Sequence, residues 1–164
     1  MTKVLPLLRF LSILVYESKI FSHNKLTTVP AEIGELSSLC SLTLTNNQIS
    51  SIPDEITRCA SLTQFDISHN SLSHLPANIG HLTELKKLSV KYNRLSCLPD
   101  SLESCTKIEY LNIENNTIES ISQSIFDRLV SVRIAILSRN KFTQLPKMNK
   151  MTDLDSFSGR LKVL

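Results

Sequence analysis

Apolar residues follow two superimposed patterns along the chain. Over short stretches they alternate with polar residues, as in Leu42-Thr43-Leu44 and Leu88-Ser89-Val90, which predicts strands with one buried face. At a constant offset after each stretch come an asparagine and then, in most segments, a proline. The frame is LxxLxLxxNxLxxLPxxIxxL, and the segment from Leu85 reads LKKLSVKYNRLSCLPDSLESC. The pattern therefore repeats as one unit of strand, turn and return segment.

The asparagines give the length of this unit. They fall at intervals of 23, 23, 23, 23 and 24 residues, at Asn24, Asn47, Asn70, Asn93, Asn116 and Asn140. This period predicts an α/β leucine-rich-repeat solenoid of about six repeats. Its strands are expected to form a curved parallel sheet on the concave face, with short helical or irregular turns on the convex face. The predicted divisions are an irregular segment 1–19, the repeat array 20–146 and a non-repeat tail 147–164.

Each position of the frame has an expected physical role. The asparagine side chains, which we call the asparagine ladder, should satisfy backbone groups of the turns. The fifth repeat has Ser122 in place of its proline and one extra residue near Phe126. Lys19 falls at an inward position, and 147–164 contains no capping pattern, as in a fragment of a longer array. We therefore expect the first and sixth repeats to fray. The convex side of the core should be closed by Ile33, Ile56, Ile79, Leu102 and Ile125.

Composition narrows the class of protein. Apolar residues make up 41% of the chain and charged residues 20%, which excludes a disordered chain. The net charge of +3 comes from the ends, because 21–146 holds 11 basic and 12 acidic residues. The body is therefore not expected to bind nucleic acid or acidic lipid. The apolar run 4–15 is too short to span a bilayer and contains Arg9, and we expect no membrane span.

The cysteines and histidines predict no chemistry. Cys59 and Cys105 occupy apolar positions of the frame, and no CxxC pair occurs. His23 and His69 lie two repeats apart, about 10 Å at the usual strand spacing, too far for one metal ion without other ligands. We expect no catalytic residue, cofactor or metal. The thiols indicate a reducing compartment, so the predicted location is cytoplasmic or nuclear. A secreted receptor fragment that uses 1–15 as a signal stays open as an alternative.

The outward positions of the strands supply the candidate binding residues. Aromatic and charged side chains meet there on a rigid sheet, which is typical of a protein-binding hot spot. A merely solvated polar face is the competing interpretation. Ile134 and Ile136 also point outward and are less easily explained by solvation. The candidate set is Gln64, Asp66, His69, Lys87, Lys91, Tyr92, Tyr110, Asn112 and Glu114.

Several stretches that the frame does not dictate carry a resemblance. They are AEIGEL at 31–36, YNRLS at 92–96 and LNIENN at 111–116. Over about 20–146 the chain resembles the Suppressor-of-Clear leucine-rich-repeat scaffolds of Ras–RAF signalling, within the Ras-group intracellular repeat proteins. The resemblance implies a non-catalytic scaffold that binds an active Ras-type GTPase and the type-one protein phosphatase catalytic subunit. In that family the assembly removes an inhibitory phosphate from RAF and promotes MAP-kinase signalling.

The resemblance also implies contacts at six of the candidate positions, namely Asp66, His69, Lys91, Tyr92, Asn112 and Glu114. An acidic GTPase surface would face Lys91, and a basic patch would face Glu114. The chain departs from the family in having about six repeats and no long N-terminal tail with a phosphatase-docking motif. The alternative function is a generic recognition module, such as the substrate reader of a ubiquitin ligase or an adhesion or polarity scaffold.

Overall fold

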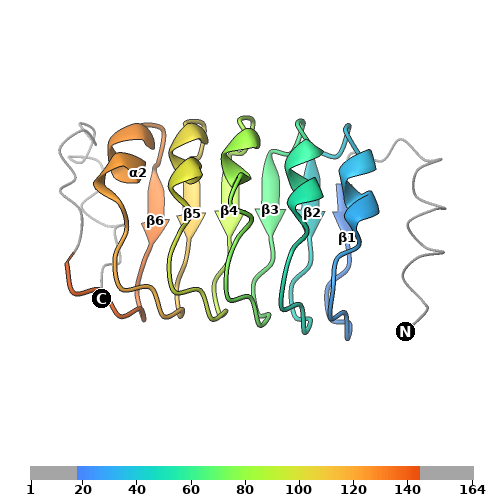
Figure 1. Ribbon diagram of the computed structural model, residues 1–164, viewed down its shortest axis with the longest axis horizontal. Helices are drawn as coiled ribbons and strands as arrows, with labels where there is room; N and C mark the ends of the chain where they lie inside the picture. The colour runs from blue at the N-terminus through green and yellow to red at the C-terminus, as the bar shows by residue number, and fades with distance from the viewer. Residues whose placement is uncertain (1–17, 145–164) are drawn as a thin grey trace.

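The computed structural model describes residues 18–144, which form a solenoid of six repeats (Figure 1). The predictions made for 1–17 and 145–164 lie outside the described residues. All strands pair in parallel in one sheet, in the order of the chain, as the repeat pattern predicts. The first strand begins at Ser18, two residues before the predicted start of the array. The strands are β1 (Ser18–Ile20), β2 (Ser41–Thr43), β3 (Gln64–Asp66), β4 (Lys87–Ser89), β5 (Tyr110–Asn112) and β6 (Ile134–Ile136).

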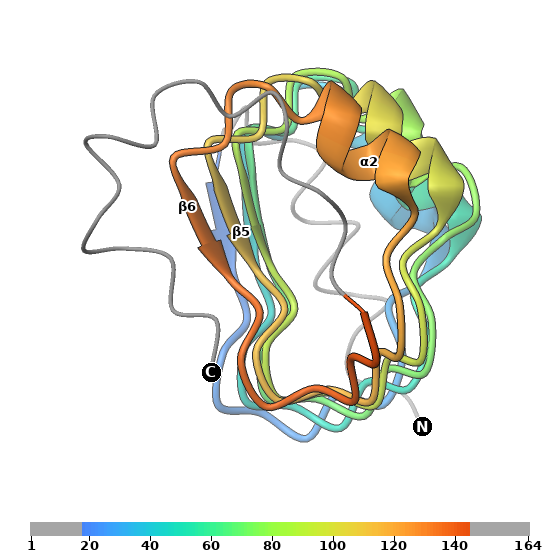
Figure 2. The ribbon, with the colours of Figure 1, turned by 90° about the vertical axis from the view of Figure 1, so that its left-hand side faces the viewer.

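The return segments form the second layer. An end-on view places the sheet on one side and the helical turns on the other (Figure 2). Prolines Pro30, Pro53 and Pro99 precede three of these turns with φ between −73° and −67°, and their carbonyls accept the first turn hydrogen bond. The turns are η1 (Ala31–Glu35), η2 (Asp54–Arg58), η3 (Ile79–His81), η4 (Asp100–Ser104) and the α-helix α2 (Gln123–Arg128).

The extra residue of the fifth repeat has a structural consequence. The return segments of the first four repeats form 3-10 turns, whereas the fifth forms the six-residue α-helix α2. Ser122 stands at its N-terminus, where three of the other turns have proline. The insertion is thus absorbed on the convex face, and β5 and β6 keep their register on the other side.

The core lies between these two layers. Inward residues of neighbouring strands pair in register, for example Phe65 with Leu88 and Leu88 with Leu111. Each is at most 1% exposed. The residues predicted to close the core from the convex side are all buried, so this prediction is confirmed. Lys19 is also inward and only 5% exposed. Stacking in register lets every repeat bury apolar area that it cannot bury alone.

The asparagine ladder has its predicted role. Asn93 accepts a hydrogen bond from the Leu72 amide at 2.9 Å and donates to the carbonyls of Ile67, Val90 and Lys91 at 3.0–3.3 Å. Asn47, Asn70, Asn116 and Asn140 repeat this arrangement. The first member, Asn24, donates within its own turn and is exposed. Each inner asparagine thus joins its own repeat to the preceding one.

The residue just before each asparagine adopts an unusual backbone conformation. Its φ lies between 54° and 57°, in the left-handed region that non-glycine residues rarely occupy. None of these six residues is glycine or β-branched, and two of them are asparagine, which tolerates this conformation best. We call them the pre-asparagine row: His23, Asn46, His69, Tyr92, Asn115 and Arg139.

Candidate protein-binding face

The parallel register arranges the outward side chains in rows that run across the repeats. The first row starts each strand, with Gln64, Lys87 and Tyr110 in neighbouring positions. The next row ends each strand, with Asp66, Ser89 and Asn112. Backbone hydrogen bonds continue this register to the third row, which contains Ser68, Lys91 and Glu114, and to the pre-asparagine row. The nine predicted candidates therefore lie together on β3, β4 and β5 and the turns that follow them.

Four side chains of this face form one connected network. The rings of His69 and Tyr92 stack with centroids 4.4 Å apart and an interplanar angle of 9°. The Tyr92 hydroxyl accepts a hydrogen bond from Arg139 Nη1 at 3.1 Å. Arg139 Nε in turn lies 3.9 Å from Glu114 Oε1. The network spans the third to the sixth repeat and presents aromatic, cationic and anionic groups side by side.

Arg139 belongs to this network but is absent from the candidate binding residues predicted from the sequence. It occupies the same position of the frame as Tyr92, and 47 residues separate the two. The sequence identifies Arg139 as outward but gives no sign that it reaches past the fifth repeat to Tyr92. Its side chain is 64% exposed, whereas that of Glu114 is 23% exposed. The guanidinium is therefore open to a partner as well as to its neighbours.

The side chains in the middle of the face are small and buried. Ser68 and Ser89 are 1% and 8% exposed, and their hydroxyls lie 2.8 Å apart. An Asp66 carboxylate oxygen accepts a hydrogen bond from the Ser68 amide at 3.0 Å. Hydrogen bonds therefore orient the Asp66 carboxylate and the Ser68 hydroxyl. These short side chains form a floor from which the longer side chains of the adjacent positions project.

The candidate role of Asn112 needs a correction. The sequence places it outward as a contact residue, but it is only 3% exposed. Its Nδ2 donates to the Tyr110 hydroxyl at 3.1 Å, and its Oδ1 accepts from the Glu114 amide at 3.0 Å. Larger neighbours cover the short amide, so it has little surface left for a partner. Asn112 instead orients Tyr110 and the backbone at Glu114.

The two lysines of β4 and its following turn give the face its available positive charge. Lys87 is exposed and Lys91 is half-buried, with Lys91 Nζ 5.9 Å from the Tyr92 ring centroid. Within the part of the chain that the structure describes, neither forms a salt bridge. Ser89 separates them along the strand, so their Cα atoms lie about 13 Å apart. A partner can meet both ammonium groups without breaking an existing ion pair.

An apolar area borders these charges. Tyr110, Ile134 and Ile136 are half-buried on β5 and β6. The prediction that the two isoleucines point outward is consistent with their partial exposure beside the buried Ala135. Large apolar side chains at the centre of an interface contribute most of its binding energy. The face therefore combines an apolar end with the charged network next to it.

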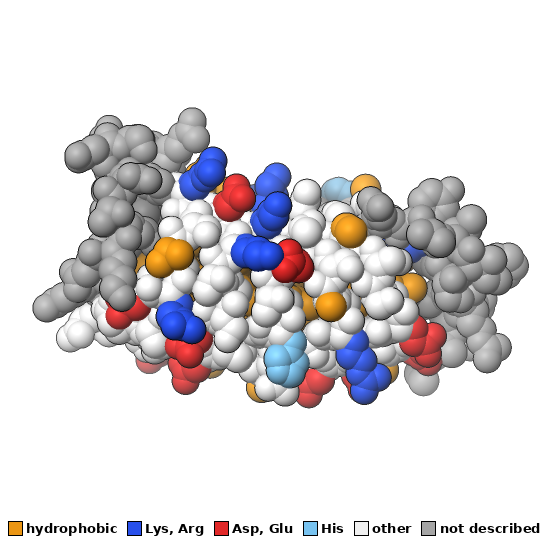
Figure 3. Space-filling view, turned by 90° about the horizontal axis from the view of Figure 1, so that it is seen from above, with side chains coloured by type: hydrophobic (Ala, Val, Ile, Leu, Met, Phe, Trp, Pro, Cys, Tyr) orange, Lys and Arg blue, Asp and Glu red, His pale blue; other side chains and the backbone are white. Residues whose placement is uncertain are grey.

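The edge at which the strands begin differs from this face. Seen from above, basic and acidic side chains alternate along it (Figure 3). Lys107 and Glu84 form a salt bridge of 2.6 Å there, with both side chains about half exposed. Exposed pairs of this kind contribute little to stability. Lys107 is thus paired with a carboxylate at this edge, whereas no salt bridge of the described residues includes Lys87 or Lys91.

The cysteines do not add a reactive site to this face. Cys59 and Cys105 are fully buried, and desolvation raises the pKa of each thiol to about 11. Cys59 donates to the Ile33 carbonyl at 3.2 Å. Residues 18–144 contain no group of three or more His, Cys, Asp or Glu side chains placed to hold a metal ion. Within the same range, no helix is long and apolar enough to cross a membrane.

The chain belongs to the leucine-rich-repeat family. A family model described as a leucine-rich repeat region matches residues 2–134. No curated protein matches in a sequence comparison. Leucine-rich-repeat proteins are generally protein-binding modules without catalytic activity.

Solved structures agree with this assignment. The ectodomain of the receptor kinase SOBIR1 from Arabidopsis thaliana is 30% identical, with a TM-score of 0.69, over 78% of this chain and 72% of its own. A leucine-rich-repeat protein from Leptospira interrogans is 29% identical, with a TM-score of 0.64, over 79% of this chain and 38% of its own. The Arabidopsis thaliana receptor kinase GASSHO1/SCHENGEN3, solved with CASPARIAN STRIP INTEGRITY FACTOR 2, is 31% identical, with a TM-score of 0.70, over 76% of this chain and 16% of its own. The chain thus spans well under two thirds of the length of the last two proteins.

Proposed function

We propose that this chain is a non-catalytic scaffold that binds a Ras-type GTPase through its concave face. The observation that carries the proposal is the pair of lysines without salt bridges, Lys87 and Lys91, beside the network of His69, Tyr92 and Arg139. The resemblance of the sequence to the Ras–RAF repeat scaffolds supplies the identity of the partner. The charge of the face supports it, because an acidic effector surface is complementary to both lysines.

The pre-formed network favours tight binding. Stacking and hydrogen bonding hold Tyr92 in one orientation before a partner arrives, which lowers the conformational entropy lost on association. Glu114, 23% exposed and beside Arg139, offers an acceptor to a basic side chain of the partner. The GTPase would thus be recognised by charge at Lys91 and by aromatic contact at Tyr92.

The same resemblance extends the proposal to a second partner. The type-one protein phosphatase catalytic subunit would join the GTPase on the solenoid, and the assembly would act on RAF and promote MAP-kinase signalling. Such a scaffold works in the cytoplasm, where these partners are found. The first experiment concerns the GTPase, because the charged network gives that contact a defined site.

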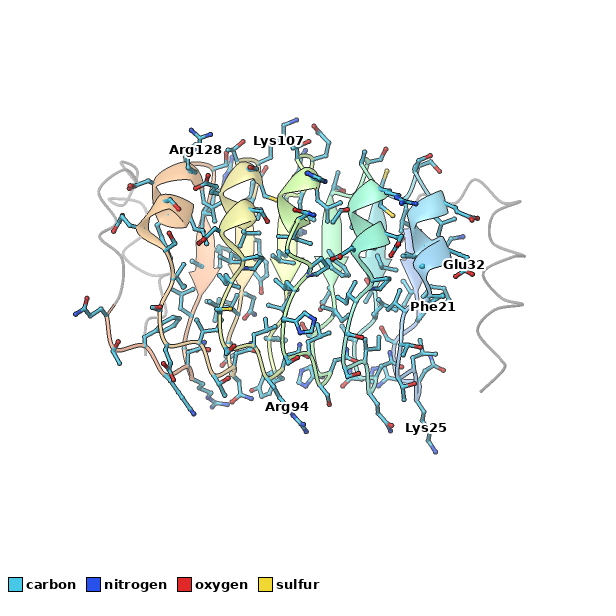
Figure 4. The ribbon with its side chains drawn as sticks, in the orientation of Figure 1. Phe21, Lys25, Glu32, Arg94, Lys107 and Arg128 are labelled. Carbon is cyan, nitrogen blue, oxygen red and sulfur yellow. The ribbon has the colours of Figure 1, made fainter. Side chains whose placement is uncertain are left out.

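The test is calorimetric titration of the chain with Ras-family GTPases loaded with a GTP analogue or with GDP. We expect binding to the GTP-analogue form and weaker or no binding to the GDP form. Lys91→Glu should reduce affinity about tenfold, since it places a carboxylate against an acidic surface. Lys25→Glu is the matched control, because Lys25 points away from the body in Figure 4 and lies in the first repeat. Equal binding by the Lys91→Glu and Lys25→Glu variants would refute the assigned site.

A generic recognition module is the second candidate function. It is favoured by the similar identities, 29–31%, shared with a bacterial repeat protein and with plant receptor ectodomains. Those values reflect a frame that many repeat proteins have in common. This candidate function predicts a partner whose binding does not depend on the nucleotide state of any GTPase. No binding to either form of the GTPases, by a chain shown to be folded by circular dichroism, would favour it over the scaffold.

A further inference from the structure

A groove lies on the flank of the solenoid, away from the concave face. It has a volume of about 570 Å³ and runs across the segments that lead into η2, η3 and η4. Buried Leu75 and Pro76 form its floor. The second and fourth repeats supply its sides, with Ile52, Pro53 and Asp54 on one side and Cys97 and Pro99 on the other.

The groove exists because the third repeat departs from its neighbours. After its proline the second repeat has Asp54 and the fourth has Asp100, but the third has Ala77. Its 3-10 turn is also shorter, three residues rather than five, and begins at Ile79. The small side chain and the delayed turn leave a recess between two fuller repeats.

The surroundings of the groove are acidic. Segments 52–55, 74–78 and 97–101 contain three carboxylates, Asp54, Glu55 and Asp100, one histidine, His74, which lines the groove, and no lysine or arginine. The acidity continues over the convex layer, because the five helical turns together carry seven Asp or Glu and two Arg residues. Asp54 lines the groove itself, and Asp100 directly follows Pro99, which lines the opposite side. One carboxylate therefore borders the apolar floor, and a second comes one residue beyond the lining.

We propose that this groove docks an extended segment of a protein partner that carries an apolar side chain next to lysine or arginine. The apolar side chain packs on Leu75 and Pro76, and the cationic groups face Asp54 and Asp100. Charge complementarity selects this partner, because an acidic or neutral segment gains nothing from the two carboxylates. The groove is independent of the concave face, so one chain can hold two proteins at once.

Two variants test the open recess and the negative charge of the groove separately. Ala77→Leu fills the recess with an exposed side chain and leaves the carboxylates in place. Asp54→Lys reverses one charge and leaves the recess open. Glu32→Lys is the matched control for charge, because Glu32 is exposed in η1, outside the groove, and projects to the side in Figure 4. Circular dichroism checks that each variant is folded.

A phage-displayed library of random peptides serves as the probe. The library is first depleted on the Ala77→Leu variant and then selected on the unaltered chain. We expect the retained peptides to share an apolar residue next to lysine or arginine. A synthetic copy of one such peptide should bind about tenfold more weakly to Asp54→Lys and equally well to Glu32→Lys. Bound peptide should also slow alkylation of Cys97, which is exposed and lines the groove.

Three results would overturn the proposal. The library yields no peptide that distinguishes the unaltered chain from Ala77→Leu, the retained peptides lack cationic residues, or Asp54→Lys and Glu32→Lys bind alike. Lys91→Glu separates this proposal from the function proposed for the concave face. It should leave peptide binding unchanged, and Ala77→Leu should leave GTPase binding unchanged.

Discussion

The ring of Tyr92 stacks on the imidazole of His69 in the preceding repeat, with centroids 4.4 Å apart, and its hydroxyl is bonded to Arg139. Tyr92 is therefore the residue through which the network of the concave face is connected. We expect Tyr92→Ala to weaken binding of the Ras-type GTPase at least tenfold, because it removes a central aromatic side chain and releases both neighbours. Calorimetry with the GTP-analogue form measures the change.

Two further variants separate the contributions of Tyr92. Tyr92→Phe keeps the stacked ring and loses the hydrogen bond from Arg139, so its affinity should fall between those of the unaltered chain and Tyr92→Ala. Lys25→Ala is the control, since Lys25 is exposed in the first repeat, outside the network. Binding by Tyr92→Ala that matches binding by Lys25→Ala would show that the network is not the contact surface.

The asparagine ladder should contribute very unequally along the chain. Asn93 is 8% exposed and forms four hydrogen bonds, two within its own repeat and two to the preceding one. Asn93→Ala leaves the buried Leu72 amide without its partner and removes one of the hydrogen bonds to each of three carbonyls, and we expect it to lower the free energy of unfolding by about 3 kcal/mol. Asn24→Ala should cost under about 1 kcal/mol, because Asn24 is exposed and bonds only within its turn. Urea denaturation followed by circular dichroism measures both, and equal losses would contradict the cross-repeat role.

The frame of the repeat explains why the fold is predictable. Inward positions such as Leu88 must be apolar, because stacking buries them whatever the partner is. The ladder position must be asparagine, because its amide serves two repeats at once. These residue requirements recur every 23 residues, so they can be recognised from the sequence alone. Lys19 shows the same logic, since the frame alone places it inward, where it is buried.

The candidate site is less predictable because its contacts are not part of the frame. The period places Asn112 outward, but whether it is exposed depends on the size of its neighbours. The bond from Arg139 to Tyr92 joins residues 47 apart and depends on the length of the arginine side chain. The sequence also does not predict the left-handed backbone of the pre-asparagine row, because none of its six members is glycine. Side-chain packing across repeats decides these features.

The pre-asparagine row makes a prediction about stability. Asn115 has φ of 54°, which a β-branched residue adopts only with strain. We expect Asn115→Val to lower the free energy of unfolding by about 1–2 kcal/mol. Asn115→Gly is the control, since glycine occupies this region freely, and should change stability by less than about 0.5 kcal/mol. If valine is tolerated as well as glycine in urea denaturation, the left-handed conformation is not maintained in solution.

The buried thiols predict a loss of stability at alkaline pH. Desolvation raises the pKa of Cys59 and of Cys105 from 9.0 to about 11. In the unfolded chain both thiols ionise near pH 9, so between pH 9 and 11 the folded chain binds more protons than the unfolded one. The free energy of unfolding must then fall as the pH rises through this interval, and the contribution of the neutral thiols is fully present below it.

Comparison with a variant isolates the thiols from the lysines and tyrosines that ionise in the same range. The double variant Cys59→Ala, Cys105→Ala is expected to be less stable at pH 8, because each substitution removes a buried sulfur. Its stability should then fall less steeply than that of the unaltered chain between pH 9 and 11. Cys97→Ala, which removes an exposed thiol, should leave the slope unchanged. Urea midpoints measured across this pH range decide the matter, and parallel curves for the unaltered chain and the double variant would mean that the buried thiols do not remain protonated.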